Sequence, residues 1–240
     1  MIFFVPARNG STRLKGKNTM IIGGKPLIEW TFESLNVLDV EANHVIVSSD
    51  DADILFMARQ HGYVGIRRPP DLCESSSRMN DVLRHHALSG AFTTHETVCV
   101  LYPTSPLRTA DQIREACEQW DAAKMRRGWN GEVVGLMSCT PISARPHGLM
   151  RIEAGELKRN DSDGGQKFYQ SQGQPVQYRA NGSIYILAVE DILAGLVDAQ
   201  LFTPTTVPFV MDEITSLEVD TPDDAKIVEA VMQLSLVRAG

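Results

Sequence analysis

The chain has 240 residues, of which 43% are hydrophobic, and a formal net charge of −7 at pH 7. This length suits one α/β domain or two small domains, and the apolar content is ordinary for a globular protein with a sizeable core. The acidic balance argues against a nucleic-acid partner, and the lack of both an apolar run of about 18 residues and a signal-peptide pattern argues against a membrane protein.

Strands and helices alternate along the first half of the sequence. The apolar run 2–5 predicts a buried strand, which Pro6 ends because it has no N–H for the ladder. A helix should begin near Pro26, whose fixed φ suits a first turn. Its expected core residues are Leu27, Ile28, Trp30, Phe32 and Leu35. Further strands are expected at 44–48, 64–66 and 98–101, and further helices at 50–59 and from 81 to about 88.

The second half continues the alternation and adds two helix-start signals. Residues 109–112 fit a capping box, so a helix should run from there to about Trp120. Thr221 and Pro222, followed by two aspartates, announce a further helix. Later strands are expected at 133–137 and 183–187. The whole pattern predicts a mainly parallel sheet that is covered on both faces.

Between those two later strands, residues 141–178 have weak periodicity and several Gly and Pro residues. We interpret this stretch as an insertion in a single domain of residues 1–240. It should contain a hairpin in which 149–152 pairs with 156–158 across a turn at 154–155. A disordered surface loop is the alternative interpretation.

Cysteine and histidine give weak signals for metal or redox chemistry. The cysteines, at positions 73, 99, 117 and 139, show no C-x-x-C spacing, which favours reduced, packed thiols in a cytoplasmic protein. His85 and His86 are adjacent and point in different directions on a helix, so surface or packing roles explain them better than a metal site.

The most informative feature follows the first strand, where four cations fall within ten residues of an otherwise acidic chain: Arg8, Arg13, Lys15 and Lys17. Gly10 and Gly16 allow turns and close approach of the backbone. This pattern predicts a loop that cradles the polyphosphate of a nucleoside triphosphate, and a solvated basic loop is the alternative. The loop is neither the G-x-G-x-x-G fingerprint nor a P-loop, because Asn18 stands where a P-loop needs Ser or Thr.

The loop resembles the signature P-A-R-x-G-S-x-R-L-x-x-K-N of the cytidylyltransferases that activate nine-carbon sugar acids, above all the acylneuraminate cytidylyltransferases. Residues 11–14 are also similar to the related enzymes that activate the eight-carbon acid KDO. Three further stretches resemble the acylneuraminate family in the family's order. Residues 101–109 are similar to its L-Q-P-T-S-P-L-R-T, 178–185 to its F-R-x-N-G-x-I-Y, and 216–222 to its S-I-D-I-D-T.

The resemblance implies a Rossmann-like, GT-A-like nucleotidyltransferase fold, which is a three-layer α/β sandwich around a mainly parallel sheet. It implies transfer of CMP from CTP to a nonulosonic, sialic-acid-like sugar acid, with release of pyrophosphate and with Mg²⁺ as cofactor. In the family, the stretch equivalent to 141–178 reaches a second subunit and helps to complete its sugar site. The resemblance therefore also implies a homodimer, with no nucleic-acid or membrane partner.

The resemblance and the chemistry of the side chains together give a set of candidate site residues. Catalysis of cytidylyl transfer depends on positioning and on neutralising phosphate charge, and the expected catalytic residues are Arg8, Arg13, Lys17 and Asp220. The expected nucleotide-binding residues are Arg8, Asn9, Gly10, Ser11, Asn18, Arg68, Ser76 and Ser77. The expected sugar-binding residues are Tyr102, Thr104, Ser105, Tyr178, Asn181 and Phe202.

Glu218 and Asp220 are the expected metal ligands. They lie two residues apart on a segment that should be extended, so both carboxylates project to the same side and can share a hard cation such as Mg²⁺. Two solvated acids on an edge strand are the alternative.

The sequence also departs from the family pattern. Tyr102 stands where the family has Gln, Glu218 where it has Asp, and Thr12 where it has Lys. Neither a Lys near 146–148 nor an Arg near 169–172 is evident. We therefore expect intact nucleotide chemistry and altered recognition of the sugar, whose identity stays open.

Three alternative functions stay open. A KDO cytidylyltransferase is the runner-up, although residues 102–106 lack that family's Q-G-D-E-P. A non-catalytic nucleotide-sugar binding module of the same fold is the second alternative. A nicotinamide oxidoreductase is remote, because the glycine fingerprint is missing.

Overall fold

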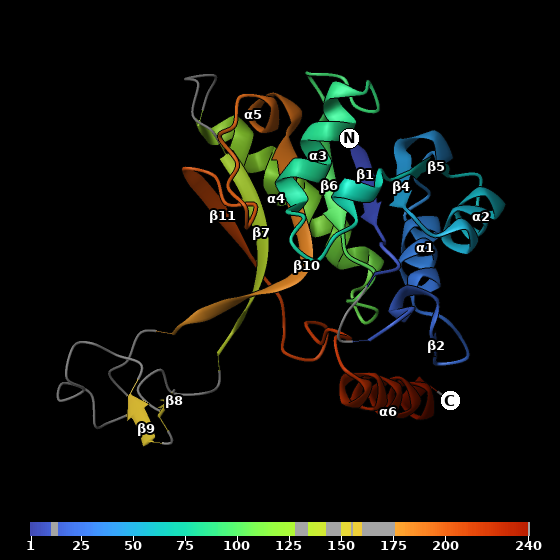
Figure 1. The fold of residues 1–240 in the computed structure, drawn as a ribbon, viewed down its shortest axis with the longest axis vertical. Helices are drawn as coiled ribbons and strands as arrows, with labels where there is room; N and C mark the ends of the chain where they lie inside the picture. Colours follow the sequence, from blue (N-terminus) through green and yellow to red (C-terminus); the bar gives the residue numbers. More distant parts are fainter. Residues whose placement is uncertain (11–13, 128–133, 143–149, 155, 160–175, 240) are drawn as a thin grey trace.

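A seven-stranded sheet forms the centre of the computed structural model, which describes residues 1–240 except 11–13, 128–133, 143–149, 155, 160–175 and 240 (Figure 1). The strand order is β11 (Thr205–Val210), β7 (Val134–Pro141), β10 (Tyr178–Ala188), β6 (Thr97–Leu101), β1 (Ile2–Pro6), β4 (Val45–Ser49) and β5 (Val64–Arg67). Neighbouring strands are parallel except around β10, which is antiparallel to both β6 and β7. The prediction of a mainly parallel sheet is confirmed, with one reversed strand that the sequence pattern does not predict.

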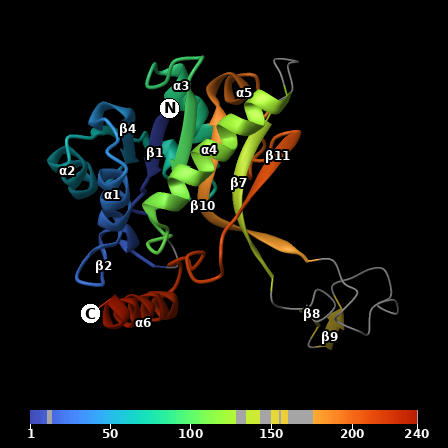
Figure 2. The same ribbon diagram turned by 180° about the vertical axis from the view of Figure 1, so that it is seen from behind.

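Helices cover both faces of the sheet and give the expected three layers (Figures 1 and 2). Successive side chains of β1 alternate between two cores, because Phe3 and Val5 join one cluster and Ile2 and Phe4 the other. The first core also receives side chains from α1 (Leu27–Val37), α2 (Ala52–Gln60) and α4 (Ala110–Arg127), and the second from α3 (Met79–Leu88) and α5 (Val189–Leu193). Burial on both faces explains why β1 is apolar throughout.

A third, smaller core joins the N-terminal part of the chain to α6 (Pro222–Ala239), which lies at one end of the sheet (Figure 1). Val228 and Met232 of α6 pack in it with Ile22 and Leu27. Ile22 belongs to the short pair of strands β2 (Ile21–Ile22) and β3 (Lys25–Pro26), which leads into α1. This packing holds the segment after β1 close to the segment before α6.

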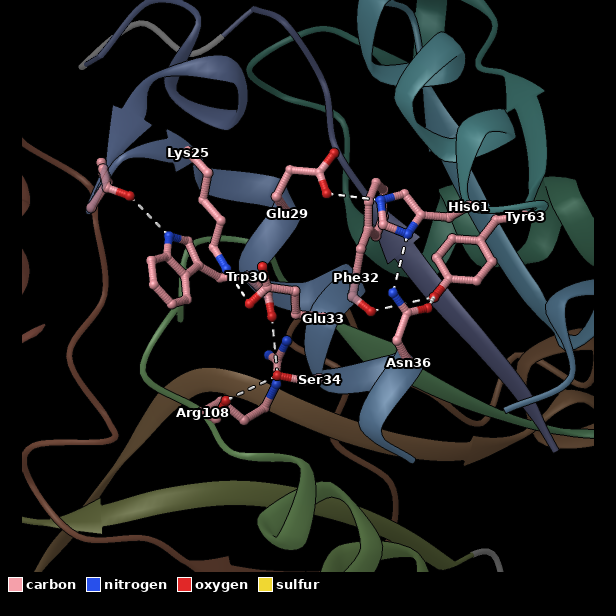
Figure 3. Close-up of polar contacts among 11 residues, drawn as sticks. Lys25, Glu29, Trp30, Phe32, Glu33, Ser34, Asn36, His61, Tyr63 and Arg108 are labelled. Carbon is pink, nitrogen blue, oxygen red and sulfur yellow. Dashed lines mark hydrogen bonds and ion pairs between the residues drawn. The ribbon is translucent and has the colours of Figure 1, made fainter. Parts of the chain in front are cut away.

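Polar side chains fix α1 to the chain that follows α2 (Figure 3). His61 donates from Nε2 to Glu29 at 2.8 Å and accepts at Nδ1 from the amide of Asn36 at 3.2 Å. The hydroxyl of Tyr63 donates to Asn36 Oδ1 at 2.6 Å, and burial raises the pKa of Tyr63 to about 12, so that it remains a donor. These contacts hold α1 against the chain that follows α2.

Beyond the body of the sheet, β7 and β10 continue as a two-stranded arm in which Tyr178 pairs with Pro141 (Figures 1 and 2). A separate hairpin follows, formed by β8 (Met150–Glu153) and β9 (Glu156–Arg159) with Ala154 at a left-handed φ of 52°. The predicted hairpin is confirmed, with strand bounds that differ by one residue. The rest of the expected insertion, 143–149, 155 and 160–175, lies outside the described residues.

Several boundaries differ from the sequence prediction. Pro26 lies in β3, just before α1, rather than in the first helical turn. β4 begins at Val45, because His44 ends a short 3-10 helix, and α3 begins at Met79. α4 continues seven residues beyond the expected end, to Arg127, since residues 121–127 are good helix formers without Gly or Pro.

Among the strands of the central sheet and the helices that cover it, α5 and β11 are not predicted from the sequence, and neither is the separate short pair β2 and β3. α5 has only five residues, which is too short for a periodic signal. β11 contains Pro208, which argues against a central strand but is tolerated here because β11 forms the edge of the sheet. Of the core residues expected along α1, only Trp30 is partly rather than fully buried.

The weak cysteine and histidine signals have structural explanations. All four cysteines are free, with Cys99 and Cys139 buried. His86 is buried and His85 is exposed, so the adjacent rings point apart as predicted. Among the described helices, none is both long and apolar enough to cross a bilayer.

Candidate functional site

A cavity of about 420 Å³ opens at the edge of the sheet where β1, β5 and β6 end. In open α/β sheets, ligands bind at the carboxyl ends of the strands. The charged and amide groups that line it are Arg8, Lys17, Asn18, Arg68, Glu218 and Asp220. The other lining residues include Pro6, Ser75, Met79, Tyr102, Thr104, Gly182 and Tyr185. The structure therefore brings together expected site residues from four separate parts of the sequence.

The loop after β1 is tied to the loop after β5. Arg8 donates from Nη1 to the carbonyls of residues 73 and 74, at 3.1 and 2.7 Å. Asn18 donates its amide to the carbonyl of Arg8 at 3.0 Å. Asn18 Oδ1 is buried and has no hydrogen-bond partner in the described part of the chain. Because such an acceptor is costly to leave unpaired, this oxygen is suited to a donor group on a ligand.

Not every expected residue of this loop reaches the cavity. The backbone N–H of Asn9 donates to the Asp50 carboxylate at 2.8 Å, and Gly10 lies against the carbonyl of Cys73. Neither residue lines the cavity, and Lys15 is exposed to solvent. Ser11 and Arg13 lie outside the described residues.

The two acids of the cavity flank a buried residue. Val219 is fully buried, and its N–H donates to the carbonyl of Thr104 at 2.7 Å, which fixes the segment beside the end of β6. Glu218 and Asp220 both line the cavity on either side of it. Lys17 Nζ lies 2.8 Å from Asp220 Oδ1. This ion pair joins the loop after β1 to residues 218–220.

Gly182 makes room for one of these acids. It lies where the register of β10 on β7 shifts, between Ala180 and Tyr185, and it adopts a φ of 60°. A Cβ at this position would lie 2.5 Å from Glu218 Oε1. A Gly inside a strand pattern is the sequence signal for such a close approach. The motif around Gly182 does not by itself indicate this role.

Asn181 is an expected sugar-binding residue that the structure places in the core instead of the cavity. It is fully buried, its Oδ1 accepts from the Ser138 hydroxyl at 2.6 Å, and its Nδ2 donates to Ser216 Oγ at 2.7 Å. Both ends of its amide are therefore used inside the protein. In this structure Asn181 holds the segment that leads to Glu218.

Arg108 supports the turn after β6 from below. It is buried, and it donates to the carbonyls of Tyr102 and Ser183 at 3.2 and 2.9 Å and to Thr31 Oγ1 at 3.0 Å. Burial lowers the pKa of Arg108 to about 10. Figure 3 shows its carbonyl beside Ser34 of α1, whose hydroxyl donates to it at 3.3 Å. The turn that carries the expected sugar-binding residues is thus fixed by β10 and α1.

Only two of the three expected sugar-binding residues in that turn line the cavity. Thr104 and Tyr102 line the cavity, whereas Ser105 is buried and its hydroxyl has no partner among the described residues. In the loop after β5, Ser75 lines the cavity. Its expected neighbours do not line it. Ser76 is exposed and contacts Glu74, and Ser77 is half-buried and donates to the carbonyl of Asp71.

Two tyrosines separate this cavity from a second, more apolar one of about 350 Å³. The rings of Tyr102 and Tyr185 meet edge to face, with centroids 5.8 Å apart. Burial raises the pKa of Tyr185 to about 12 and that of Tyr102 further, so both phenols stay protonated. The second cavity is also lined by Met79, Met137, Ala180, Ala199, Gln200, Leu201 and Phe202. Tyr178, which is half exposed, lines neither cavity.

Comparison with known proteins gives consistent results over the whole chain. A family model described as cytidylyltransferase matches residues 2–240. The chain is 31% identical over 242 residues to CMP-N,N'-diacetyllegionaminic acid synthase of Legionella pneumophila, a match that covers 96% of this chain and 95% of that protein. It is 27% identical to N-acylneuraminate cytidylyltransferase of Streptococcus agalactiae over 93% of this chain, and it spans about half (51%) of that longer protein.

Solved structures support the same fold. The chain superposes on CMP:2-keto-3-deoxy-manno-octonic acid synthetase, solved in complex with CTP, with a TM-score of 0.67 and 20% identity over 98% of both chains. At that identity the likeness concerns the fold alone. It supports the α/β architecture described above.

Proposed function

This chain belongs to the cytidylyltransferase family, and on that premise we propose that it transfers CMP from CTP to a nonulosonic, sialic-acid-like sugar acid and releases pyrophosphate. The observation that carries the proposal is the meeting of three cations with two carboxylates in one cavity at the ends of the parallel strands. The near full-length match to the Legionella enzyme supports the choice of a nine-carbon acid.

In this reaction an acceptor hydroxyl of the sugar acid attacks the α-phosphorus of CTP. The new O–P bond forms as the hydroxyl proton is lost to water, while the bond from the α-phosphorus to the bridging oxygen breaks and pyrophosphate leaves with the electron pair. Arg8, Lys17 and Arg68 are suited to the triphosphate, because guanidinium and ammonium groups offset the charge that develops on the leaving group. The unpartnered Oδ1 of Asn18 would accept from a hydroxyl or amino group of the nucleoside.

Mg²⁺ is part of the proposal, with Glu218 and Asp220 as its protein ligands. Mg²⁺ binds through one or two carboxylates together with substrate phosphates and water, rather than in an all-protein cage. The donor set fits, since Glu218 and Asp220 offer two carboxylates in the same cavity as the cations proposed for the phosphates. When bound, the ion would neutralise phosphate charge, and Gly182 leaves Glu218 the space to face it.

The apolar second cavity is the proposed place for the acyl groups of the sugar acid. Tyr102 and Tyr185 line both cavities, so a sugar held there would lie next to the nucleotide. Phe202 is 45% exposed at its rim and would cover an acyl methyl group. Thr104 offers a hydroxyl on the nucleotide side.

Pyrophosphate release from CTP and Mg²⁺, measured across a panel of eight- and nine-carbon keto-sugar acids, tests the proposal. We expect the fastest release with a nine-carbon acid. Fastest release with the eight-carbon acid KDO would instead favour the KDO alternative. Tight CTP binding without release from any acid would contradict the proposal and support a binding module.

The metal assignment has its own matched pair of variants. Asp220→Asn should lower turnover by about a hundredfold or more, because the carboxylate that holds the ion is lost. Asp223→Asn removes an acid three residues away that is 83% exposed and pairs with Lys226, so it should keep full turnover. Full turnover of the Asp220 variant would defeat this assignment.

We also propose a cytoplasmic homodimer. Four free cysteines are consistent with a reducing compartment. The arm of β7 and β10 carries exposed apolar groups at its end, among them Val176 and Tyr178, which are 64% and 50% exposed. Exposed apolar side chains on a projecting arm suit contact with a second copy of the chain.

A further inference from the structure

His86 is a buried side chain to which the proposed reaction gives no role. It lies on α3 with 1% of its surface exposed, and its ring is 5.2 Å from that of Phe4 and 6.1 Å from that of Phe92. Its Nε2 lies 2.8 Å from the hydroxyl of Ser48, at the end of β4. The same hydroxyl contacts Arg68, which connects this ring to the cavity.

The hydrogen bonds of this cluster favour one tautomer of His86. Arg68 can only donate, and its Nε lies 3.1 Å from Ser48 Oγ, so Oγ is the acceptor of that bond. The one hydroxyl proton of Ser48 can then be donated to His86 Nε2 when the ring carries its proton on Nδ1. In this neutral tautomer the Ser48 hydroxyl both accepts from Arg68 and donates to His86. Burial, aided by His85 and Arg68, lowers its pKa to about 4, in agreement with a neutral ring.

Arg68 is held almost entirely by this one serine. Its side chain is 3% exposed, its Nη2 donates to the carbonyl of Ser48 at 3.0 Å, and its own N–H donates to the carbonyl of Ser49 at 2.9 Å. No carboxylate in the described part of the chain forms an ion pair with it, and Nη1 has no hydrogen-bond partner among these residues. A buried guanidinium that lines a cavity in this way is suited to an anion in that cavity.

We propose that His86 is a positioning residue that acts through Ser48. Its Nε2 directs the Ser48 hydroxyl, whose lone pairs then hold the guanidinium of Arg68 with Nη1 presented to the cavity. The inference rests on the proposed function, in which the anion at Nη1 is a phosphate of CTP. Without an acceptor at position 86, the hydroxyl can rotate, and Arg68 loses the partner that fixes its Nε.

The test is the dissociation constant for CTP, measured by titration calorimetry on the full chain. His86→Phe keeps an aromatic ring between Phe4 and Phe92 but removes the acceptor, and it should weaken CTP binding about tenfold, the effect of one lost hydrogen bond in a charged network. His86→Gln offers an amide oxygen and should restore most of the affinity. His85→Phe, on the exposed side of the same helix, should change nothing.

A double-mutant cycle separates positioning from general loosening of the fold. Arg68→Met should weaken CTP binding by itself, and adding His86→Phe to it should have no further effect. Wild-type affinity in the folded His86→Phe protein would overturn the inference. So would a loss of equal size with and without Arg68, because the effect would then not pass through the guanidinium.

Two further measurements keep the inference testable if His86→Phe does not fold. Ser48→Ala removes the hydroxyl itself and should weaken CTP binding as much as His86→Phe. Nitrogen NMR of the His86 ring at neutral pH should show an unprotonated Nε2, and a protonated Nε2 would overturn the inference. A wild-type protein that binds no CTP would defeat the proposed function, whereas the NMR measurement would still decide whether the chain from His86 to Arg68 exists.

Discussion

The absence of a side chain at Gly182 leaves the space that the carboxylate of Glu218 occupies. Gly182 has no side chain to compete with Glu218, and its left-handed backbone is open to glycine at little cost. The atom that an added methyl group would meet is the end of a flexible side chain. We therefore expect substitution here to move Glu218 and to reduce activity more than stability.

Gly182→Ala should lower turnover about tenfold or more, because misplacement of a metal-binding carboxylate by about an ångström is enough for such a loss. The unfolding free energy should fall by only about 1–2 kcal/mol, the cost of a left-handed alanine. Pyrophosphate release and urea unfolding measure the two effects separately.

Gly195→Ala is the matched control for this prediction. Gly195 has a similar φ of 75°, and the nearest atom to a Cβ there would be Arg84 Nη1 at 3.9 Å, away from the cavity. This variant should show the loss of stability without the loss of turnover. Equal turnover in the two variants would refute the role given to the contact between Gly182 and Glu218.

The lowered pKa of His86 makes stability depend on pH. The ordinary pKa of 6.5 applies to the unfolded chain, and burial lowers it to about 4 in the folded protein, so between these values the unfolded state binds more protons. The stabilisation is complete above pH 6.5 and is lost as the pH falls toward 4. The free energy of unfolding should decrease by about 1.4 kcal/mol per pH unit in this window from this group.

Urea unfolding of wild type and His86→Phe at several pH values measures this contribution. The stability difference between the two proteins should shrink as the pH falls from 6.5 to 4. His85→Phe should keep most of the wild-type slope, because His85 is exposed. A difference that stays constant with pH would show that His86 does not lose its proton on folding.

At the residue scale, the motifs do not predict the direction in which each side chain points. Lys17, Glu218 and Asp220 line the cavity. Asn181 belongs to an equally clear motif, yet it faces the core, because a register shift in β10 determines which side chains turn inward. A single sequence carries no signal for that shift beyond the neighbouring glycine.

At the element scale, the first turn of α6 both stabilises the helix and fixes the backbone of Asp220. Asp224 Oδ2 accepts from the N–H of Thr221 at 2.7 Å and from the N–H of Asp220 at 3.1 Å. Thr221 Oγ1 accepts from the N–H of Asp224 at 3.2 Å, which completes the predicted cap. One carboxylate therefore caps the helix and also fixes the backbone of a proposed metal ligand.

Asp224→Ala should lower the unfolding free energy by about 1–2 kcal/mol through loss of the cap. It should also raise the Mg²⁺ concentration needed for half-maximal turnover, because the backbone of Asp220 loses an anchor. Asp223→Ala, at a position whose side chain is 83% exposed, is the control and should change neither quantity. A loss of stability with unchanged Mg²⁺ dependence would limit Asp224 to the cap.

The elements themselves could be predicted where sequence signals are local. Apolar runs between helices predict the strands β1, β4, β5 and β6. The capping residues at the start of α4 and α6 can be recognised from the sequence. The reversed direction of β10 could not be predicted, since an apolar strand has the same composition in either direction. β11 could not be predicted because it contains Pro208. Proline is tolerated in a strand at the edge of a sheet, and the sequence does not show which strand lies at the edge.

At the scale of the whole molecule, the projecting arm predicts association. Sedimentation equilibrium at micromolar concentration should give twice the chain mass of 26.5 kDa. Tyr178→Glu places a charge on the exposed end of β10 and should weaken the dimer about tenfold or more. Leu88→Glu introduces the same charge at a 70% exposed position on α3, and it should leave the dimer intact. A wild-type chain that sediments as a monomer would contradict the homodimer.

The order of the strands also sets the order in which the protein can be assembled during synthesis. β1, β4, β5 and β6 all precede residue 102 and are neighbours in the sheet, so this half can pair before the rest of the chain has been made. Lys17 meets Asp220 only 203 residues later. A nascent chain thus carries the cations that are proposed to bind phosphate long before the acids that face them, and a chain cut short before residue 220 would keep Lys17 without its carboxylate partner.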